Sequence, residues 1–308
     1  MDKIKISLSQ LKVDFVEDFD VVEISTLKIN QKIKLAIFPK SVQQLTSVLR
    51  ILYRSKQVYK VVGNTSNLLF VGIVSFPVIF TNKMKDEYRI ENNLVTVSAG
   101  MQISRLIEIL KRNKLGGIEG LVGIPATVGG AVFNNASAYN NSISSHLVKI
   151  SAFYAGKIIE IKARQIKFGY HFSNLKGIVL LSLTFLFENK SEYDIIKLCN
   201  EYTYKRTSMQ PSGFSLGSVY QKINDKSAGF YIERAGLKLT RFGGIVVSKK
   251  HANFFVNDKQ GSAEDFLNLQ KLVEKKVSEQ FGITLIPEIE KVGEYYETSC
   301  GSSYTFKK

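Results

Sequence analysis

A glycine-rich run in the middle of the chain restricts the possible folds more than any other stretch. The segment from Glu119 to Tyr139 has few charges and many small residues, includes Pro125, and belongs to a cluster of glycines at positions 116, 117, 120, 123, 129 and 130. Glycine lets a backbone approach a ligand closely, and exposed N–H groups in such loops can hold phosphate oxygens. The run predicts a loop that cradles a flat or phosphorylated ligand; the alternative is a set of tight turns between buried strands.

The composition indicates a globular protein of more than one domain. A length of 308 residues predicts two or three domains, and a hydrophobic content of 44% is ample for their cores. The net charge of +15 favours polyanionic partners: nucleic acid, a membrane surface or phosphorylated small molecules. The lysines are scattered, with no block of five, so we expect no nucleic-acid partner.

The cysteines and apolar segments bear on location. Cys199 and Cys300 are too few for a disulfide framework or a four-cysteine metal site, so we expect ordinary thiols in a reducing cytoplasm and no metal. No apolar signal segment is evident near the N-terminus. The longest apolar run, Ile178 to Phe187, has about half the length that a membrane helix needs, so we expect no membrane insertion.

The first two thirds of the chain is rich in strands and loops. Residues 1–33 resemble short strands, Ser41 can cap a helix, and Ile103 to Lys114 forms an amphipathic helix. Further strands are predicted at 58–62, 78–82, 94–99, 148–154, 157–162 and 178–187. The strand at 58–62 leads into a polar turn, Gly63 to Leu69, which offers N–H groups and hydroxyls to a ligand or forms an ordinary loop.

The pattern changes after residue 193. A helix capped by Asp194 is predicted to end near Arg206, and Met209 to Gly213 forms a turn that suits a domain boundary. Further helices are predicted at 228–235 and 262–281, the second with Ser262 and Asp265 in a capping box and Gly282 as its stop. Strands are expected at 244–248, 253–256 and 283–292.

Taken in order, these pieces resemble the UDP-N-acetylenolpyruvoylglucosamine reductase (MurB) family from about residue 25 to Gly293. The family's flavin loops, Gly-Gly-Gly-Ser-Asn-Leu-Leu and Gly-Leu-x-Gly-Ile-Pro-Gly-Thr-Val-Gly-Gly-Ala, look like Gly63–Leu69 and Gly120–Ala131. Other family motifs match Asn135–Asn140, Phe168–His171, Gly217–Ser218, Ala228–Lys238, Lys250–Phe254 and Pro287–Gly293. The chain is similar to the shorter branch of this family.

The resemblance implies an α+β fold. It predicts a two-lobed FAD-binding unit of the PCMH-like type at residues 1–196, with lobes of about 1–82 and 83–196. A smaller α+β substrate domain of the MurB C-terminal type follows at 197–308, and its last segment, 286–308, returns toward the flavin. We expect a cytoplasmic monomer.

The activity implied by the resemblance is an FAD-dependent, NADPH-linked reduction. It converts UDP-N-acetylglucosamine enolpyruvate to UDP-N-acetylmuramate, a step of peptidoglycan precursor synthesis for the cell wall. NADPH reduces FAD, the nicotinamide product leaves, and the UDP-sugar takes its place. Flavin performs the hydride chemistry, while the protein supplies position, electrostatics and an acid.

The resemblance also implies roles for single residues. Ser218 is the candidate acid and Glu288 its partner near the reacting carboxylate; otherwise they are a loop serine and a strand-edge carboxylate. His171 is the third catalytic candidate, and Tyr170 and Lys222 are candidate contacts to the UDP-sugar. The candidate flavin-binding residues are Gly63, Asn64, Thr65, Ser66, Asn67, Gly123, Ile124, Thr127, Gly129 and Gly130.

The chain departs from the family pattern at several positions. Asn64, Thr65, Ala126, Ser137 and Asn140 replace loop glycines; a methyl group at residue 126 is harmless only if φ is negative. His171 replaces a substrate-binding arginine, and Lys222 replaces an asparagine. Two alternatives therefore stay open: a flavoenzyme of this fold acting on another nucleotide sugar, and a non-catalytic relative that has lost flavin.

Overall fold

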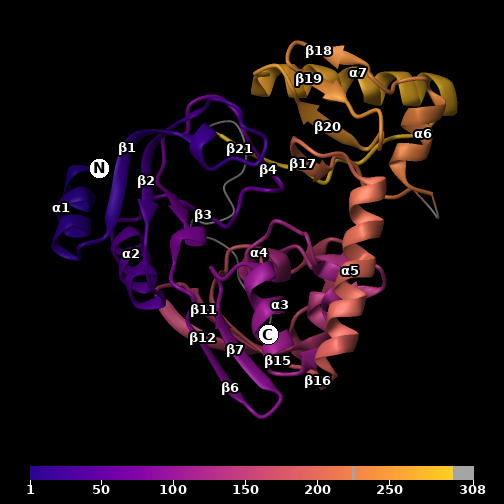
Figure 1. The fold of residues 1–308 in the computed structure, drawn as a ribbon. Helices are drawn as coiled ribbons and strands as arrows, with labels where there is room; N and C mark the ends of the chain where they lie inside the picture. The colour runs from indigo at the N-terminus through magenta and orange to yellow at the C-terminus, as the bar shows by residue number, and fades with distance from the viewer. Residues whose placement is uncertain (224–225, 294–308) are drawn as a thin grey trace.

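The computed structural model describes residues 1–223 and 226–293. Cys300 and the end of the predicted returning segment lie outside the described residues. Figure 1 shows three packed units, with the N-terminal lobe and the central lobe below and a smaller C-terminal unit above them. The predicted α+β class is confirmed, since helices and sheets with antiparallel strands occur in each unit.

The first lobe is built on a four-stranded sheet of order β1-β2-β5-β3. Strand β1 (Asp14–Asp20) runs antiparallel to β2 (Lys32–Phe38), while β5 (Val78–Phe80) and β3 (Lys60–Val62) continue the sheet in parallel. Helix α2 (Val42–Arg54) packs on this sheet, and the predicted cap is confirmed because Ser41 accepts a hydrogen bond from the Gln44 N–H at 3.1 Å.

One prediction for this lobe was wrong. Residues 2–10 form a helix, α1 (Asp2–Gln10), rather than strand-like pieces. The apolar residues Ile4, Ile6 and Leu8 alternate as in a strand, which is the pattern that misled the prediction. The helix instead buries Ile4 and Leu8 against α2 and leaves Ile6 60% exposed.

The central lobe carries a five-stranded antiparallel sheet of order β12-β11-β15-β7-β6. One face packs against α3 (Ile103–Arg112) and α4 (Val128–Phe133), and the other joins the core under α2 through Phe153, Val179 and Leu181. The strands are β6 (Tyr88–Glu91), β7 (Leu94–Ser98), β11 (Leu147–Tyr154), β12 (Lys157–Lys162) and β15 (Val179–Leu186). Two-stranded pairs are β8 (Leu115–Gly116) with β16 (Glu188–Asn189), β9 (Ser137–Ala138) with β10 (Asn141–Ser142), and β13 (Phe168–Gly169) with β14 (Phe172–Ser173).

Helix α5 (Glu192–Met209) leads from the central lobe to the C-terminal unit along one side of the molecule (Figure 1). It begins earlier than predicted. Its cap is Ser191, which accepts a hydrogen bond from the Asp194 N–H at 3.1 Å, so Asp194 is not the cap.

The C-terminal unit is a four-stranded sheet covered by two helices. Its strand order is β17-β20-β19-β18, with β17 (Phe214–Ser218), β18 (Arg241–Phe242), β19 (Ile245–Val247) and β20 (Phe254–Asn257). Helices α6 (Ala228–Arg234) and α7 (Ala263–Phe281) pack on it, and α7 buries Phe266, Leu269, Val273 and Val277. The predicted capping box of Ser262 and Asp265 is confirmed, as is the stop at Gly282, which has φ of 65°.

The chain then returns to the first lobe. Only β21 (Glu290–Val292) of the predicted strand at 283–292 is a regular strand, and it pairs in parallel with β4 (Leu68–Phe70). The C-terminal core also includes Leu27, Ile29 and Leu69 of the first lobe. The returning segment therefore joins the first lobe to the C-terminal unit beside the turn that follows β3.

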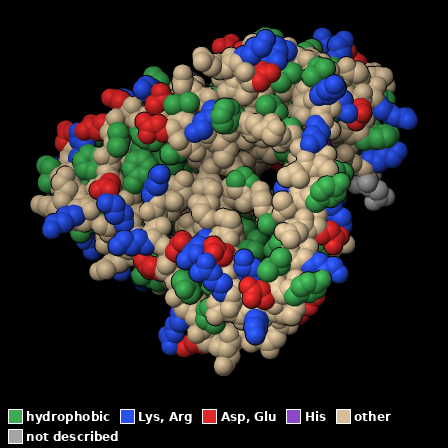
Figure 2. Space-filling view, viewed as in Figure 1, with side chains coloured by type: hydrophobic (Ala, Val, Ile, Leu, Met, Phe, Trp, Pro, Cys, Tyr) green, Lys and Arg blue, Asp and Glu red, His purple; other side chains and the backbone are tan. Residues whose placement is uncertain are grey.

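On the face seen in Figure 2, Lys and Arg side chains are scattered among Asp and Glu. Within residues 1–223 and 226–293, no helix is both long enough and apolar enough to span a membrane.

Candidate functional site

A cavity of about 1120 Å³ lies where the three units meet. Figure 2 shows a hollow in the middle of the molecule below the C-terminal unit. Its wall includes both predicted loops, the Tyr170–His171 turn, the end of β17 and the returning segment. The cavity is larger than the usual range of roughly 300–1,000 Å³ for small-molecule sites, so it suits an extended ligand or two ligands in contact.

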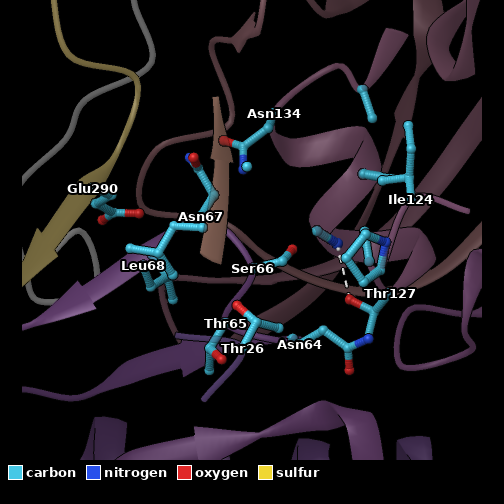
Figure 3. A pocket seen from close by; sticks show the side chains of 18 of the residues that line it. Thr26, Asn64, Thr65, Ser66, Asn67, Leu68, Ile124, Thr127, Asn134 and Glu290 are labelled. Atoms are coloured by element: carbon cyan, nitrogen blue, oxygen red, sulfur yellow. Dashed lines mark hydrogen bonds between the residues drawn. The ribbon is translucent and has the colours of Figure 1, made fainter. Parts of the chain in front are cut away.

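The first loop, residues 63–67, leaves β3 and presents its backbone to the cavity. Within the described chain, the backbone N–H groups of Asn64, Thr65, Ser66 and Asn67 donate to no backbone acceptor. Figure 3 shows Asn64, Thr65 and Ser66 facing Thr127 and Ile124 of the second loop. Four successive amides without a backbone partner in this wall can bind phosphate oxygens.

The replaced glycines of the first loop are accommodated in two ways. Asn64 has no positive φ, and its carboxamide pairs with that of Gln102, which donates from Nε2 to Asn64 Oδ1 at 2.9 Å. Thr65 keeps the left-handed conformation, with φ of 58°, and its hydroxyl donates to the carbonyl of Ile24 at 3.3 Å. A β-branched residue is strained there, by about 1–2 kcal/mol, so this contact helps to hold the turn.

Most N–H groups of the second loop, residues 120–131, donate to acceptors of the loop or of neighbouring segments. Thr127 caps α4, accepting from the Gly130 N–H at 3.2 Å, while the Gly129 N–H donates to the carbonyl of Ala99 at 2.8 Å. Gly123 has φ of 79°, where a side chain would be strained. Ala126 has a negative φ, so its methyl group imposes no backbone strain.

The two loops touch at Gly63. A β-carbon on Gly63 would lie 2.3 Å from Thr127 Oγ1, which is far inside a normal contact distance. This glycine is therefore required by the close approach of the two loops rather than by a special backbone conformation. Together the loops form one continuous wall.

Ser218 and Glu288 both line the cavity, and a backbone hydrogen bond joins Glu288 to the residue after Ser218. Ser218 is the last residue of β17, after a register shift and Gly217, which has φ of 79°. The Glu288 N–H donates to the carbonyl of Val219 at 2.8 Å. Both residues line the cavity, so the structure brings together two side chains that are 70 positions apart in the sequence.

The Glu288 carboxyl is almost completely buried. Its side chain is 7% exposed, and Oε1 has no hydrogen-bond partner among the described residues. His171 Nδ1 lies 3.7 Å from Oε2. Burial raises the pKa of Glu288 to about 7, against the opposing effects of the Tyr170 hydroxyl and the Lys222 charge. A carboxyl with such a pKa can hold or release a proton near neutral pH.

Tyr170 and His171 occupy the turn between β13 and β14. Burial, followed by the charge of Glu288, raises the pKa of Tyr170 to about 12, so it remains a neutral donor. Burial and, less strongly, the Lys222 charge lower the pKa of His171. His171 therefore favours the neutral imidazole, which lacks the fixed charge and two-pronged geometry of arginine.

Lys222 lies outside the cavity wall. Its side chain is exposed, and Nζ lies 5.8 Å from the centre of the Tyr170 ring. It contributes positive charge near His171 and Glu288 without lining the cavity.

Several cavity residues were not predicted. Thr26 and Lys28 lie between β1 and β2, Arg206 lies on α5, and Lys250 lies between β19 and β20. Arg206 Nε donates to the carbonyl of Val122 at 3.0 Å, which fixes the second loop to α5. The sequence signal at Arg206 was only a charge in an exposed helix, and no local pattern shows that it faces the loop.

No metal site is evident. Within the described ranges, no group of three or more His, Cys, Asp or Glu side chains could hold a metal ion.

Family models match two parts of the chain. Residues 33–161 match the FAD binding domain, and residues 210–292 match the UDP-N-acetylenolpyruvoylglucosamine reductase C-terminal domain. The two matched ranges contain the two loops and the Ser218–Glu288 pair, respectively.

Curated proteins match over nearly the full length. The UDP-N-acetylenolpyruvoylglucosamine reductase of Caldicellulosiruptor saccharolyticus is 34% identical over 95% of this chain and 96% of its own. That of Lactococcus lactis subsp. cremoris is 34% identical over 87% of this chain and 91% of its own.

A solved structure agrees with these matches. The MurB crystal structure from Thermus caldophilus superposes with a TM-score of 0.76 at 27% identity, covering 91% of this chain and 98% of that one.

Proposed function

The chain belongs to the UDP-N-acetylenolpyruvoylglucosamine reductase family, and from this premise we propose how its own residues serve the family's reaction. The protein is an FAD-dependent oxidoreductase with NADPH as reductant. It reduces UDP-N-acetylglucosamine enolpyruvate to UDP-N-acetylmuramate for peptidoglycan synthesis.

The cavity fits FAD on the chain's own features. The first loop offers N–H groups without a backbone partner, and Thr26 Oγ1 is buried in the same wall without a hydrogen-bond partner among the described residues. Residues 63–67 of the first loop, and Gly123, Ile124, Thr127, Gly129 and Gly130 of the second, would hold the cofactor. FAD, when bound, supplies the hydride chemistry by accepting hydride from NADPH and delivering it to the enol ether. These features argue against a relative that has lost flavin.

Ser218 acts as the acid in this proposal. When hydride adds to the carbon β to the substrate carboxylate, the carbon–carbon double bond breaks and negative charge develops toward that carboxylate. The Ser218 hydroxyl donates its proton to the α carbon, which completes the lactyl ether. A serine hydroxyl is a weak acid, so it needs a strongly basic, enolate-like partner.

Glu288 and Tyr170 assist the reaction in the same part of the cavity as Ser218. The observation that carries the proposal is the hydrogen bond between the Glu288 N–H and the Val219 carbonyl at 2.8 Å, which attaches a buried carboxyl with an unpartnered oxygen to the backbone next to Ser218. With a pKa of about 7, Glu288 can carry its proton and donate to the developing charge. The neutral Tyr170 hydroxyl interacts with this carboxyl and opposes the rise of its pKa.

A second substrate is supported by one specific observation. His171 has a lowered pKa and stands where the family pattern has arginine, so the site provides less fixed positive charge for an enolpyruvyl carboxylate. Lys222 supplies a cation nearby, from outside the cavity wall. A related nucleotide sugar is therefore the alternative substrate.

The arrangement supports three further proposals. We place the division between the FAD-binding unit and the substrate domain at residues 196 and 197, which falls within α5. A monomer suffices, since one chain supplies every candidate residue. The reaction takes place in the cytoplasm, where NADPH and nucleotide sugars are available, and involves no nucleic acid.

Ser218→Ala tests the proposal by separating the two half-reactions. Stopped-flow absorbance follows reduction of the bound flavin by NADPH and its reoxidation by the UDP-sugar. Loss of a positioned acid slows reoxidation by roughly 10²–10⁴-fold, and reduction keeps its parental rate because it needs no proton from Ser218.

Ser215→Ala is the matched control. It makes the same substitution on the same strand, on the other side of the register shift, and should slow neither half selectively. Reoxidation of Ser218→Ala at the parental rate, or an equal slowing of both halves, contradicts the assignment of Ser218.

A further inference from the structure

We propose that Asn253 is the positioning residue that sets the Ser218 hydroxyl against Glu288, an inference that rests on the function proposed above. Asn253 is 4% exposed and lies just before β20. It contacts neither substrate nor cofactor in this proposal. Its action is exerted through the backbone of the residues that follow Ser218.

Asn253 holds that backbone at three points. Its Oδ1 accepts a hydrogen bond from the Tyr220 N–H at 3.0 Å, and its Nδ2 donates to the Tyr220 carbonyl at 2.8 Å. Its own carbonyl accepts from the Val219 N–H at 2.8 Å. One residue therefore satisfies both main-chain groups of Tyr220 and the donor of Val219.

Glu288 is attached to the opposite side of the same segment. The Val219 carbonyl accepts from the Glu288 N–H at 2.8 Å, and the Gln221 N–H donates to the Ile286 carbonyl at 2.9 Å. Residues 218–221 thus lie between Asn253 and the returning segment. A shift of this middle segment would change the position of Ser218 relative to Glu288.

The β17 ladder alone does not hold Ser218 in place. Its register shifts between Ser215 and Ser218, where Gly217 takes φ of 79°. Such irregularities bend a strand and leave groups without ladder partners. The pairing of β17 with β20 ends at Ser218, opposite Phe254. Beyond that point the Asn253 carboxamide holds the Tyr220 backbone, because it offers a donor and an acceptor on one short, planar group.

Aspartate at position 253 would disturb this arrangement with little change of shape. One carboxylate oxygen could still accept from the Tyr220 N–H. The other would face the Tyr220 carbonyl, where two acceptors repel each other, and a buried group left unpaired is destabilising. We therefore expect residues 219–220, and Ser218 with them, to shift.

Asn257 provides a matched control at the far end of β20. It is 5% exposed and also makes three hydrogen bonds to backbone. They go to the carbonyls of Leu27 and Lys28 and the N–H of Gly261, not to the Ser218 segment. Asn257→Asp thus makes the same chemical change in the same strand.

The experiment compares Asn253→Asp and Asn257→Asp in the full-length holoenzyme. A misplacement of about 1 Å costs roughly 100-fold in rate, so Asn253→Asp should slow flavin reoxidation by the UDP-sugar by about that factor and leave reduction by NADPH near the parental rate. Asn257→Asp should change the ratio of the two half-reactions little. Calorimetry should show that both substitutions lower the melting temperature.

A double variant separates positioning from general destabilisation. If Asn253 acts through Ser218, Asn253→Asp should slow reoxidation much less in the Ser218→Ala background than in the parent, because residues that act as a unit are not additive. Full additivity of the two effects overturns the inference. If Asn253→Asp does not fold, Asn253→Ser, which replaces the carboxamide with a single shorter hydroxyl, takes its role in the same comparison.

The inference and the proposed function fail in different ways. If Ser218→Ala slows reoxidation selectively but Asn253→Asp reoxidises at the parental rate, Asn253 does not position Ser218. The same conclusion follows if both Asp variants slow both half-reactions equally. If Ser218→Ala itself has no selective effect, the proposed role of Ser218 fails first.

Discussion

The two ends of the cavity are built from different parts of the polypeptide. The proposed flavin end is formed by main chain, with amides of residues 64–67 that have no backbone partner among the described residues and a glycine that lets the loops touch. The proposed reaction end is formed by side chains of the cavity wall: Ser218, Glu288, Tyr170 and His171. A site formed by main chain restricts which backbone conformations the residues can have. A site formed by side chains restricts which residue types can stand at each position.

This difference explains which departures from the family pattern matter. At the proposed flavin end, Ala126 has negative φ. Asn140, which does not line the cavity, occupies the left-handed region, with φ of 62°, which asparagine tolerates. Both replacements are compatible with the backbone conformation. At the proposed reaction end, histidine in place of arginine at position 171 changes the charge and the hydrogen-bond geometry that a substrate would meet.

Gly129→Leu should have the largest effect, because it disturbs the part of the cavity wall that is formed by main chain. A β-carbon there would lie 2.9 Å from both the β-carbon and the carbonyl oxygen of Ala99, so α4 would have to move. We expect the FAD content of the purified protein to fall by more than roughly 10-fold, which corresponds to a loss of about 1.4 kcal/mol in binding. Flavin absorbance per protein measures it.

Gly130→Ala is the graded comparison for this variant. Its β-carbon would meet only Thr127 Oγ1, at 3.2 Å. A smaller loss of FAD is expected, and equal loss in the two variants would contradict the role given to the Ala99 contact.

The Glu288→Gln variant tests the buried carboxyl through the pH dependence of folding stability. The folded pKa of about 7 exceeds the ordinary value of 4.5, so the native state holds this proton more tightly than the unfolded chain. Its contribution to stability is full below pH 4.5 and declines as the pH rises to 7. Glutamine stays neutral, so the variant should be more stable than the parent at pH 8 by about 3 kcal/mol.

Urea unfolding at pH 5 and pH 8 measures this difference. The stability gap between variant and parent should grow with pH across that interval. A constant gap would show that the Glu288 carboxyl is not held protonated by burial.

The His171→Arg variant distinguishes between the enolpyruvyl UDP-sugar and another nucleotide sugar as the substrate. Arginine binds a carboxylate through two parallel hydrogen bonds, so we expect kcat/KM for the enolpyruvyl UDP-sugar to rise by roughly 3–10-fold, or about 1 kcal/mol. Steady-state kinetics with NADPH measures it. Complete loss of activity would mean that the pocket is adapted to histidine and would favour the other nucleotide sugar.

Ala126→Gly should have the smallest effect. Because φ at this position is already negative, glycine adds only flexibility in the unfolded chain and should destabilise by about 0.4–1 kcal/mol without weakening FAD binding. Isothermal titration of the apoprotein with FAD and thermal unfolding measure the two quantities.

Gly123→Ala, at φ of 79°, should lower stability by about 1–2 kcal/mol. A larger effect at 126 than at 123 would refute the conformational explanation.

Much of the fold could be predicted from local sequence. The order of the motifs identified the α+β class, and Ser41 and the Ser262–Asp265 box marked helix starts that the structure contains. These capping interactions join residues that are close together in the chain, so they can be recognised from local sequence. The same dependence on local pattern caused the error at α1, where alternating Ile4, Ile6 and Leu8 suggested a strand. Packing of Ile4 and Leu8 against α2 decided the outcome.

The arrangement of the site was decided by tertiary structure. The sequence alone could single out Ser218 and Glu288, but not that the backbone of Val219 links them, nor that Asn253 holds the same segment from the other side. Arg206 and Thr26 reach the cavity from elements far away in the chain, and Lys222 stays outside it. The raised pKa of Glu288 arises from burial by residues distant in sequence. Sequence determines which groups are available, whereas their mutual distances and solvent exposure, which set their chemistry, depend on long-range packing.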